Sequence, residues 1–354
     1  MQDKKDTYSY MWPRDGALVA LALQKAGYSE LVENFYAFCK DIISDFGCFL
    51  HKYNPDGSLG SSWHPWIKNG KPQLPIQEDG TALVIYALWD YYTRTKNKDL
   101  IKKLYKPLIS KAADFMVNYI NKNTNLPKES YDLWEERQGI FTFTCSTVYA
   151  GLICASKFAE LFNEDKKAEL YKTAAEKIKQ AMLDYLFDKN TRRFLRMINF
   201  TGTEIMEDFT IDSSLYAIFE FGVLDANDSK VEETMKVVKE RLWVKTDVGG
   251  LTRYENDLYH KVPHDAKNVP GNPWFICTAW LGKYYVAKAK RREELKEALE
   301  IIKWLMKNSL STGAMPEQIN PYNGEPLSVS PLTWSHSEFI DLTVNYVEKY
   351  KQLK

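Results

Sequence analysis

The feature of this sequence that most restricts its fold is a succession of amphipathic helical segments that alternate in character. Apolar residues recur at helical spacing in eleven segments. These segments cover residues 16–28, 29–43, 79–95, 99–120, 142–162, 166–187, 212–224, 229–243, 272–290, 292–309 and 332–352. Within most neighbouring pairs, the first segment is more apolar and the second carries a face of Lys and Glu. This alternation predicts inner helices covered by charged outer helices, repeated around a ring.

The predicted fold class is therefore all-α, an (α/α)6 barrel of alternating inner and outer helices. Eleven segments are one fewer than six pairs require. No stretch has the composition of a disordered linker, so residues 1–354 are expected to form a single barrel domain. With 45% hydrophobic residues, the chain can bury a core of this size.

The connections between the helical pairs are long and rich in Gly, Pro, Asn and aromatic residues. They cover residues 44–78, 121–141, 188–211, 244–271 and 310–331. Long loops in a compact helical domain are usually functional. If successive helices alternate in direction, all five loops emerge at one end of the barrel and together surround a single pocket.

Composition argues against several kinds of partner and site. Lys plus Arg and Asp plus Glu both number 47, so there is no basic surface for nucleic acid. The five Cys are scattered without a C-x-x-C pair, which indicates buried reduced thiols. His260 and His264 alone are a weak case for a metal, and we predict neither a metal nor a cofactor. The sequence does not indicate an oligomeric state.

No apolar run approaches the length of a membrane span, and the N-terminus lacks the pattern of a signal peptide. The chain as given is therefore expected to be cytoplasmic and to have no membrane partner. A leader upstream of this sequence would change that expectation.

The stretch YDLWEERQGIFTF, residues 131–143, places two neighbouring carboxylates directly after a Trp and ahead of an inner helix. Like charges raise each other's cost of ionisation, and an apolar ring raises it further. Glu135 and Glu136 beside Trp134 are therefore one way to keep a carboxylic acid protonated near neutral pH, as a general acid requires. In the alternative interpretation, the Glu pair complements the helix dipole and Trp134 anchors the core. Taken alone, the alternative is the better one.

Further polar and aromatic residues fall on the same loops or just before inner helices. The adjacent Arg14 and Asp15 follow several aromatic residues, and such a pair can hydrogen-bond the vicinal hydroxyls of a sugar. Arg253, Trp274 and Glu317 lie on or beside later loops. Each has an ordinary explanation as a cap, a surface charge or a core residue. If these residues lie with the Glu pair at one rim of the barrel, carboxylates and sugar-binding groups surround one pocket there. Glycoside hydrolysis requires such an arrangement.

Six stretches, in this order, carry a resemblance to a known family. They are YMWPRDGALVALALQKAGY, QEDGTALVIYALWDYY, YDLWEERQGIFTFT, GGLTRYE, GNPWFICTAWL and MPEQINPYNGEPLS followed by LTWSHSEF. The chain resembles the catalytic domain of glycoside hydrolase family 15, the glucoamylases and glucodextranases, and the prokaryotic glucoamylases in particular. The resemblance extends over nearly the whole chain.

The resemblance implies an inverting, exo-acting α-glucosidase that releases β-D-glucose from the non-reducing ends of α-1,4-linked maltooligosaccharides or starch. Glu135 resembles the general acid, and Glu317 resembles the general base. Glu136 resembles a carboxylate that binds substrate and tunes its neighbour. The other implied substrate-binding residues are Tyr8, Trp12, Arg14, Asp15, Trp134, Arg253, Trp274 and Ser328.

Several alternatives stay open at this point. An α-1,6-specific glucodextranase and a trehalase are activities of the same family, and a non-catalytic, truncated sugar-binding domain is a different class. Fungal members place a Trp where this chain has Gln73, so Trp63 and Trp66 are the candidates to replace it at the leaving-group subsite. The family's β-sandwich domain and first barrel helix, both upstream of residue 8, are absent from the sequence given.

Overall fold

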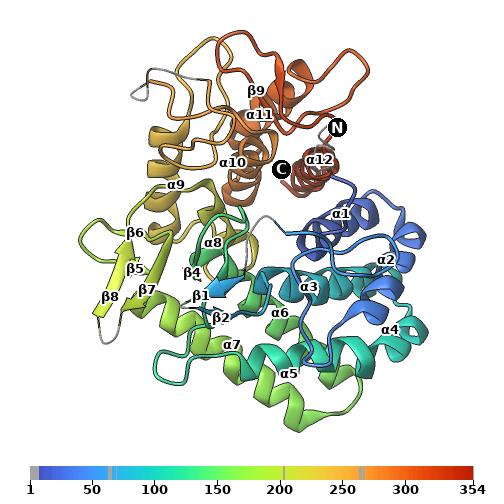
Figure 1. Ribbon diagram of the computed structural model, residues 1–354. Coiled ribbons are helices and arrows are strands. Elements are labelled where there is room, and N and C mark those ends of the chain that lie inside the picture. Colours follow the sequence, from blue (N-terminus) through green and yellow to red (C-terminus); the bar gives the residue numbers. More distant parts are fainter. Residues whose placement is uncertain are drawn as a thin grey trace, which may run out of the picture.

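The computed structural model describes residues 8–62, 66–68, 70–201, 204–262, 265 and 268–353, and it shows a ring of helices in two layers (Figure 1). In this part of the chain, six helices form the inner layer. They are α1 (Pro13–Lys25), α3 (Glu78–Thr95), α6 (Thr142–Leu161), α8 (Ala217–Glu220), α10 (Phe275–Lys288) and α12 (Thr333–Gln352). Each inner helix packs against the next, and α12 packs against α1, so the inner ring closes.

The outer layer alternates with the inner one along the chain. It consists of α2 (Ser29–Ile42), α4 (Lys98–Leu104) with the π turn η1 (Tyr105–Ser110) and α5 (Lys111–Asn118), α7 (Asp165–Tyr185), α9 (Ser229–Leu242) and α11 (Lys296–Lys307). Pro107 lies inside η1, where its missing N–H explains the local change of hydrogen bonding. Short 3-10 turns, η2 (Ser213–Tyr216) and η3 (Arg292–Leu295), precede α8 and α11. Within the described residues, no outer helix lies between α12 and α1.

Because α4, η1 and α5 form one interrupted helix, the structure contains eleven helical units in its described part, and the predicted all-α barrel is confirmed. The contrast between α6 and α7 shows why the layers form. Sixteen of the twenty residues of α6 are buried, against seven of the 21 residues of α7. A Cβ at Gly151 would lie 3.0 Å from the Cα of Ala82, so this glycine allows α6 to pack closely against α3.

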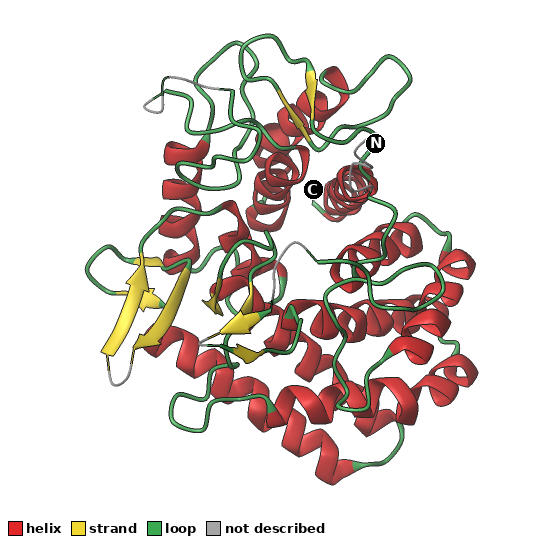
Figure 2. Cartoon of the chain, in the orientation of Figure 1, coloured by secondary structure: helices red, strands yellow, loops and turns green. Residues whose placement is uncertain are grey.

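Short strands, which the sequence did not predict, occur in the connections between helices (Figure 2). They are β1 (Ile67–Lys68), β2 (Lys71–Pro72), β3 (Ser130–Tyr131), β4 (Gln138–Phe141), β5 (Phe187–Asp188), β6 (Arg193–Phe194), β7 (Met197–Thr201), β8 (Glu204–Asp208), β9 (Gln318–Ile319) and β10 (Pro326–Leu327). An antiparallel sheet of order β3-β4-β7-β8 joins two of the long loops, and β4 leads directly into α6. This sheet holds the loop that carries the Glu pair.

All five Cys are buried free thiols, as predicted. Among the described residues, no helix is both long and apolar enough to cross a membrane.

Candidate active site

The structure brings the site residues predicted from the sequence to the end of the ring where the inner helices begin. Arg14 and Asp15 lie in the first turn of α1, and Trp274 immediately precedes α10. Glu135 and Glu136 lie between β3 and β4, and Glu317 directly precedes β9. The remaining predicted residues contact these residues or one another. They are Tyr8, Trp12, Trp134, Arg253 and Ser328.

Glu135 lies between two positively polarised side chains. Its Oε2 is 2.6 Å from Nε2 of His51, and its Oε1 is 3.7 Å from Nη2 of Arg14. The backbone of Glu135 has a φ of 61°, an uncommon left-handed conformation for a residue with a side chain. Its N–H donates to the carbonyl oxygen of Asp132 at 3.0 Å, which closes a tight turn around the carboxylate.

The environment of Glu135 favours its ionised form. Burial alone would raise the pKa of Glu135, but the hydrogen bond and charge of His51, together with the charges of Arg14 and Lys52, lower it below its ordinary value. The expectation that Glu136 and Trp134 would raise the pKa of Glu135 is therefore wrong. The reason is that His51 and Arg14, from distant parts of the chain, are the stronger influence.

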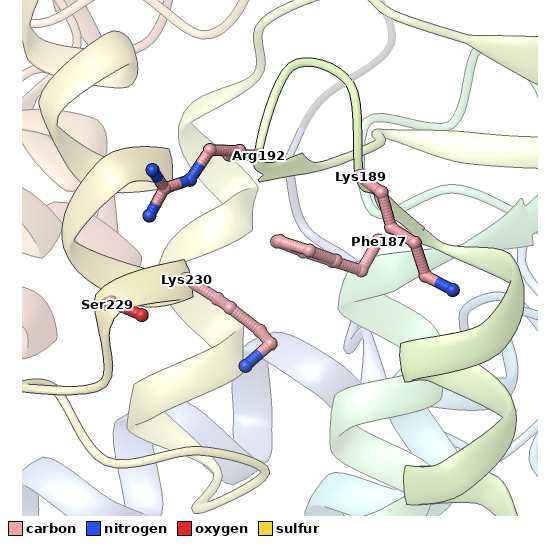
Figure 3. A pocket seen from close by; sticks show the side chains of 5 residues that line it. All are labelled: Phe187, Lys189, Arg192, Ser229 and Lys230. Carbon is pink, nitrogen blue, oxygen red and sulfur yellow. The ribbon is translucent and has the colours of Figure 1, made fainter.

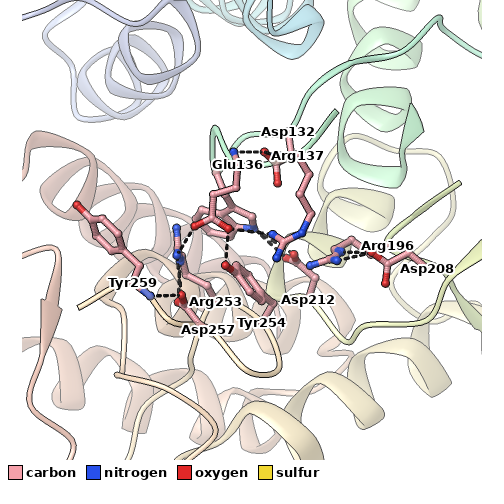
Figure 4. Close-up of polar contacts among 11 residues, drawn as sticks. Asp132, Glu136, Arg137, Arg196, Asp208, Asp212, Arg253, Tyr254, Asp257 and Tyr259 are labelled. Carbon is pink, nitrogen blue, oxygen red and sulfur yellow. Dashed lines mark hydrogen bonds and ion pairs between the residues drawn. The ribbon is translucent and has the colours of Figure 1, made fainter. Parts of the chain in front are cut away.

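Glu136 is turned toward a different set of partners, as Figure 4 shows. Its Oε1 accepts from Nη2 of Arg253 at 2.8 Å, and its Oε2 accepts from Nη1 of Arg137 at 2.9 Å and from the Tyr254 hydroxyl. Burial would raise the pKa of Glu136, but Arg253, Tyr254 and Arg137 lower it. The two neighbouring carboxylates are therefore each neutralised by partners of their own.

Arg253 is a fixed cation inside a cage of aromatic rings. Its Nε and Nη2 donate to the two carboxylate oxygens of Asp257 at 2.7 and 2.6 Å. The guanidinium carbon lies 5.2, 4.7 and 5.0 Å from the ring centroids of Trp134, Trp274 and Tyr259. Bidentate pairing and ring contacts fix the orientation of the guanidinium. Arg253 can therefore offer its bond to Glu136, or a bond to a ligand, from a constant position.

Glu317 is buried, and Tyr8 connects it to Tyr259 of this cage. The Tyr8 hydroxyl lies 3.3 Å from its Oε1 as a donor and 3.0 Å from the hydroxyl of Tyr259. Burial raises the pKa of Glu317, and this outweighs hydrogen bonding with Ser328, the charge of Arg253 and the bond from Tyr8, which lower it. The carboxylate of Glu317 is consequently a stronger base than an ordinary Glu.

Arg14 forms the third charged centre of the site. Its guanidinium is 3.1 Å from Asp15, 3.6 Å from Asp79 and 3.7 Å from Glu135, and it lies 5.2 Å from the ring centroid of Trp334. Burial raises the pKa of Asp15 to about 6, although Arg14 opposes this rise. The Asp15 side chain keeps 25% exposure, so this carboxylate can face a ligand.

The candidate residues for the leaving-group subsite all lie in the first long loop. Trp63 lies outside the described residues, whereas Trp66 packs edge-on against His51 at 5.2 Å and against Tyr131 at 4.6 Å between ring centroids. The Gln73 side chain instead donates to backbone carbonyls within its own loop. Among the described candidates, Trp66 is therefore the aromatic residue that lies next to His51, the partner of Glu135.

One cavity of the structure does not belong to this site. A cavity of about 310 Å³ lies between the β5–β6 turn and the start of α9 (Figure 3). Its described lining contains no carboxylate and consists of Phe187, Lys189, Arg192, Ser229 and Lys230.

In the described part of the chain, no three His, Cys, Asp or Glu residues are arranged to hold a metal, and His264 lies outside that part.

Residues 1–344 match the model of the family described as glycosyl hydrolases family 15. The chain belongs to glycosyl hydrolase family 15. This confirms the resemblance drawn from the six sequence stretches. The match covers every residue of the predicted site, from Tyr8 to Ser328.

Individual family 15 relatives are similar over nearly all of this chain. An uncharacterized glycosyl hydrolase of Methanocaldococcus jannaschii is 30% identical, over 94% of this chain and 50% of that protein. Trehalase 2 of Sulfolobus acidocaldarius is 26% identical, over 94% of this chain and 55% of its own length. A glucoamylase of a Clostridium species is also 26% identical, over 98% of this chain and 48% of that protein. The chain thus spans about half the length of the curated relatives it matches.

The family 15 fold is also seen in solved structures. A bacterial glucoamylase crystallised with acarbose superposes with a TM-score of 0.77 at 23% identity, covering 97% of this chain and 51% of that one. This similarity supports the (α/α)6 architecture.

Sequence analysis missed several residues of this candidate site. They are His51, Asp79, Asp132, Asp212 and Tyr259. His51 lies in the first long loop, and Asp79 lies within the stretch QEDG, so both were in regions already considered functional. Nothing in the sequence indicated which partners they contact.

Asp132 shapes the turn that presents the Glu pair. Its Oδ1 accepts from the backbone N–H groups of Glu136 and Arg137 at 2.8 and 3.0 Å. Its Oδ2 is buried and has no hydrogen-bond partner among the described residues. Burial raises the pKa of Asp132 to about 7, despite the two backbone donors.

Replacing Asp132 by Asn is expected to flatten the dependence of stability on pH. An unfolded Asp titrates near about 3.9. The stabilising contribution of the folded, protonated Asp132 is therefore fully present below about pH 4 and is lost as the pH rises through about 7. The amide keeps the acceptor oxygen but cannot ionise. Melting temperatures should be measured from about pH 4 to pH 8. Over this range, the melting temperature of the variant relative to that of the parent should rise by several degrees, which corresponds to a relative gain in the free energy of unfolding on the order of a few kcal/mol. Parallel curves would contradict this account.

Proposed function

We propose that residues 1–354 act as one catalytic domain, an inverting, exo-acting α-glucosidase of the glucoamylase type. It would hydrolyse terminal α-1,4-linked glucose from the non-reducing ends of maltooligosaccharides or starch and release β-D-glucose. The observation that carries the proposal is the pair of buried carboxylates, Glu135 and Glu317. They come from different loops and have separate partners, His51 for Glu135 and Tyr8 for Glu317.

In this proposal, Glu135 is the general acid and Glu317 is the general base. Glu135 gives a proton to the glycosidic oxygen as the bond from that oxygen to the anomeric carbon breaks. Glu317 takes a proton from a water molecule, whose oxygen bonds to the anomeric carbon from the opposite face. Because water attacks directly, the configuration inverts without a covalent enzyme intermediate. The raised pKa of Glu317 suits a base, and the hydrogen bond from Tyr8 orients its carboxylate.

The other residues of the site have binding roles in this proposal. Arg14 and Asp15 hold the hydroxyl groups of the terminal glucose, because a guanidinium and a carboxylate offer complementary donors and acceptors. Glu136 and Arg253 form a second polar contact, which Asp257 keeps in place. The aromatic rings of Tyr8, Trp12, Trp134 and Trp274 form the wall of the subsite, and Ser328 assists Glu317.

The linkage can be tested with a substrate panel. Family 15 relatives of this chain include both glucoamylases and trehalases at similar identity. Purified protein should therefore be incubated separately with maltose, maltotriose, isomaltose and trehalose, and the glucose released should be measured. We expect the highest kcat/KM on maltotriose. Preference for isomaltose would favour a glucodextranase, and preference for trehalose a trehalase. Binding of maltotriose without any hydrolysis would favour a non-catalytic sugar-binding domain.

A further inference from the structure

The loop that carries Glu317 is held against the starts of two inner helices. On one side, the backbone N–H of Phe275, the first residue of α10, donates to the carbonyl oxygen of Glu317 at 3.2 Å. The backbone N–H of Ile319 donates to the carbonyl oxygen of Pro273 at 3.0 Å. On the other side, the loop contacts the first turn of α12. The position of Glu317 therefore depends on both helices.

The first turn of α12 binds this loop through two consecutive side chains. The Ser335 hydroxyl donates to the carbonyl oxygen of Pro316 at 2.8 Å. Nε2 of His336 accepts from the backbone N–H of Met315 at 3.0 Å, and Met315 is only 4% exposed. The two residues directly before Glu317 are thus each held by a side chain of α12.

The same turn also contacts the sugar-binding part of the candidate site. The ring centroid of Trp334 lies 5.2 Å from the guanidinium carbon of Arg14, and Arg14 is 3.7 Å from Glu135. Residues 334–336 therefore connect the loop of Glu317 to Arg14. A displacement of the loop relative to this turn changes the position of Glu317 relative to both Arg14 and Glu135.

The bond from Met315 determines the form of the His336 ring. A backbone N–H can only donate, so Nε2 of His336 must present its lone pair, and the proton of the neutral ring is on Nδ1. An imidazolium carries a proton on Nε2 and cannot accept this bond. Burial lowers the pKa of His336, and this favours the neutral ring that the bond requires.

We propose that His336 is a positioning residue for the general base, because its bond from Met315 fixes the loop that directs Glu317 toward the attacking water. This inference rests on the proposed role of Glu317. A base acts only when its oxygen is within hydrogen-bond reach of the water, so a small displacement of the loop lowers the rate of the chemical step. Binding of the terminal sugar by Arg14 and Asp15 does not depend on this bond.

The test compares kcat and KM on maltotriose for the parent, His336→Gln, His336→Leu and His336→Asn. Gln can place an acceptor oxygen near the position of Nε2, whereas Leu has no acceptor and the shorter Asn cannot reach that position. For both His336→Leu and His336→Asn, we expect kcat to fall by roughly 10- to 100-fold, with KM within about twofold of the parent value. His336→Gln should restore kcat to within about threefold of the parent value. Thermal melting identifies the folded variants, and either Leu or Asn suffices for the comparison.

Two further measurements separate this role from general support of the fold. Fluoride leaves α-glucosyl fluoride with little need for a proton, but the attacking water still needs a base, so His336→Leu should lose as much activity on this substrate. In protein that already carries Glu317→Gln, adding His336→Leu should lower kcat by less than about twofold, since no base remains to be positioned. Thr333→Val, at an exposed position of the same turn, is the control and should match the parent.

The possible failures have different outcomes. A parent-like kcat in folded His336→Leu and His336→Asn would overturn the role of His336 alone. An equal loss with and without Glu317, or a loss confined to maltotriose, would also overturn it, because His336 would then act through another group. A folded parent that hydrolyses neither substrate would overturn the proposed function, and this inference with it.

Discussion

Replacement of Glu135 by Gln is expected to lower kcat on maltotriose by roughly 10²- to 10⁴-fold, the usual contribution of a general acid. The amide has nearly the shape of the carboxyl and can still contact His51, but it has no proton to donate at the required acidity. Activity on α-glucosyl fluoride should fall by less than about tenfold, because this leaving group departs largely without protonation. Initial rates on the two substrates, at the pH optimum of the parent, provide the comparison.

Glu136→Gln is the matched variant for this experiment, since the same chemical change is made one residue away. Glu136 is bound by Arg253 and Tyr254 and does not contact His51 in the described structure. Its replacement should mainly raise KM on both substrates. Equal losses on maltotriose and α-glucosyl fluoride in Glu135→Gln would contradict the assignment of Glu135 as the acid.

Replacement of Glu317 by Gln is expected to lower activity on both substrates by roughly 10²- to 10⁴-fold. An activated leaving group does not remove the need to deprotonate the attacking water, so α-glucosyl fluoride should not rescue this variant. The carboxylate of Glu317 is buried against Tyr8, and the amide of Gln accepts a proton from water far less readily.

Glu325→Gln is the control for this second experiment, because Glu325 is an exposed residue of the same loop. Its rates should match those of the parent. If Glu317→Gln were rescued by α-glucosyl fluoride while Glu135→Gln was not, the acid and base roles would have to be exchanged.

The helical framework could be predicted from the sequence because its signal is repeated over many residues. The apolar segment 142–162 and the charged segment 166–187 differ so clearly that their inner and outer positions follow directly, and α6 and α7 occupy them. The strands could not be predicted in this way, because most of them have only two residues and no periodicity can be detected over that length. The π turn around Pro107 was not predicted either, although the missing N–H of this residue explains it.

Most of the residues that form the site could be predicted from the sequence, but the direction of the pKa shift of Glu135 could not. Glu135, Glu317 and Arg253 stood out as polar residues on long loops, and Arg14 as one just before an inner helix. The structure places all four at one end of the ring. The direction of the pKa shift of Glu135 depends on His51, which is 84 residues away in sequence. Only the fold brings the two together, so the neighbouring Glu136 and Trp134 were given too much weight.

The most direct test of the central claim is the anomeric form of the first glucose released from maltotriose, followed by proton NMR before mutarotation. Initial β-D-glucose is the predicted result, and it would establish both turnover and direct attack by water activated by Glu317. Initial α-D-glucose would contradict the proposed inverting mechanism.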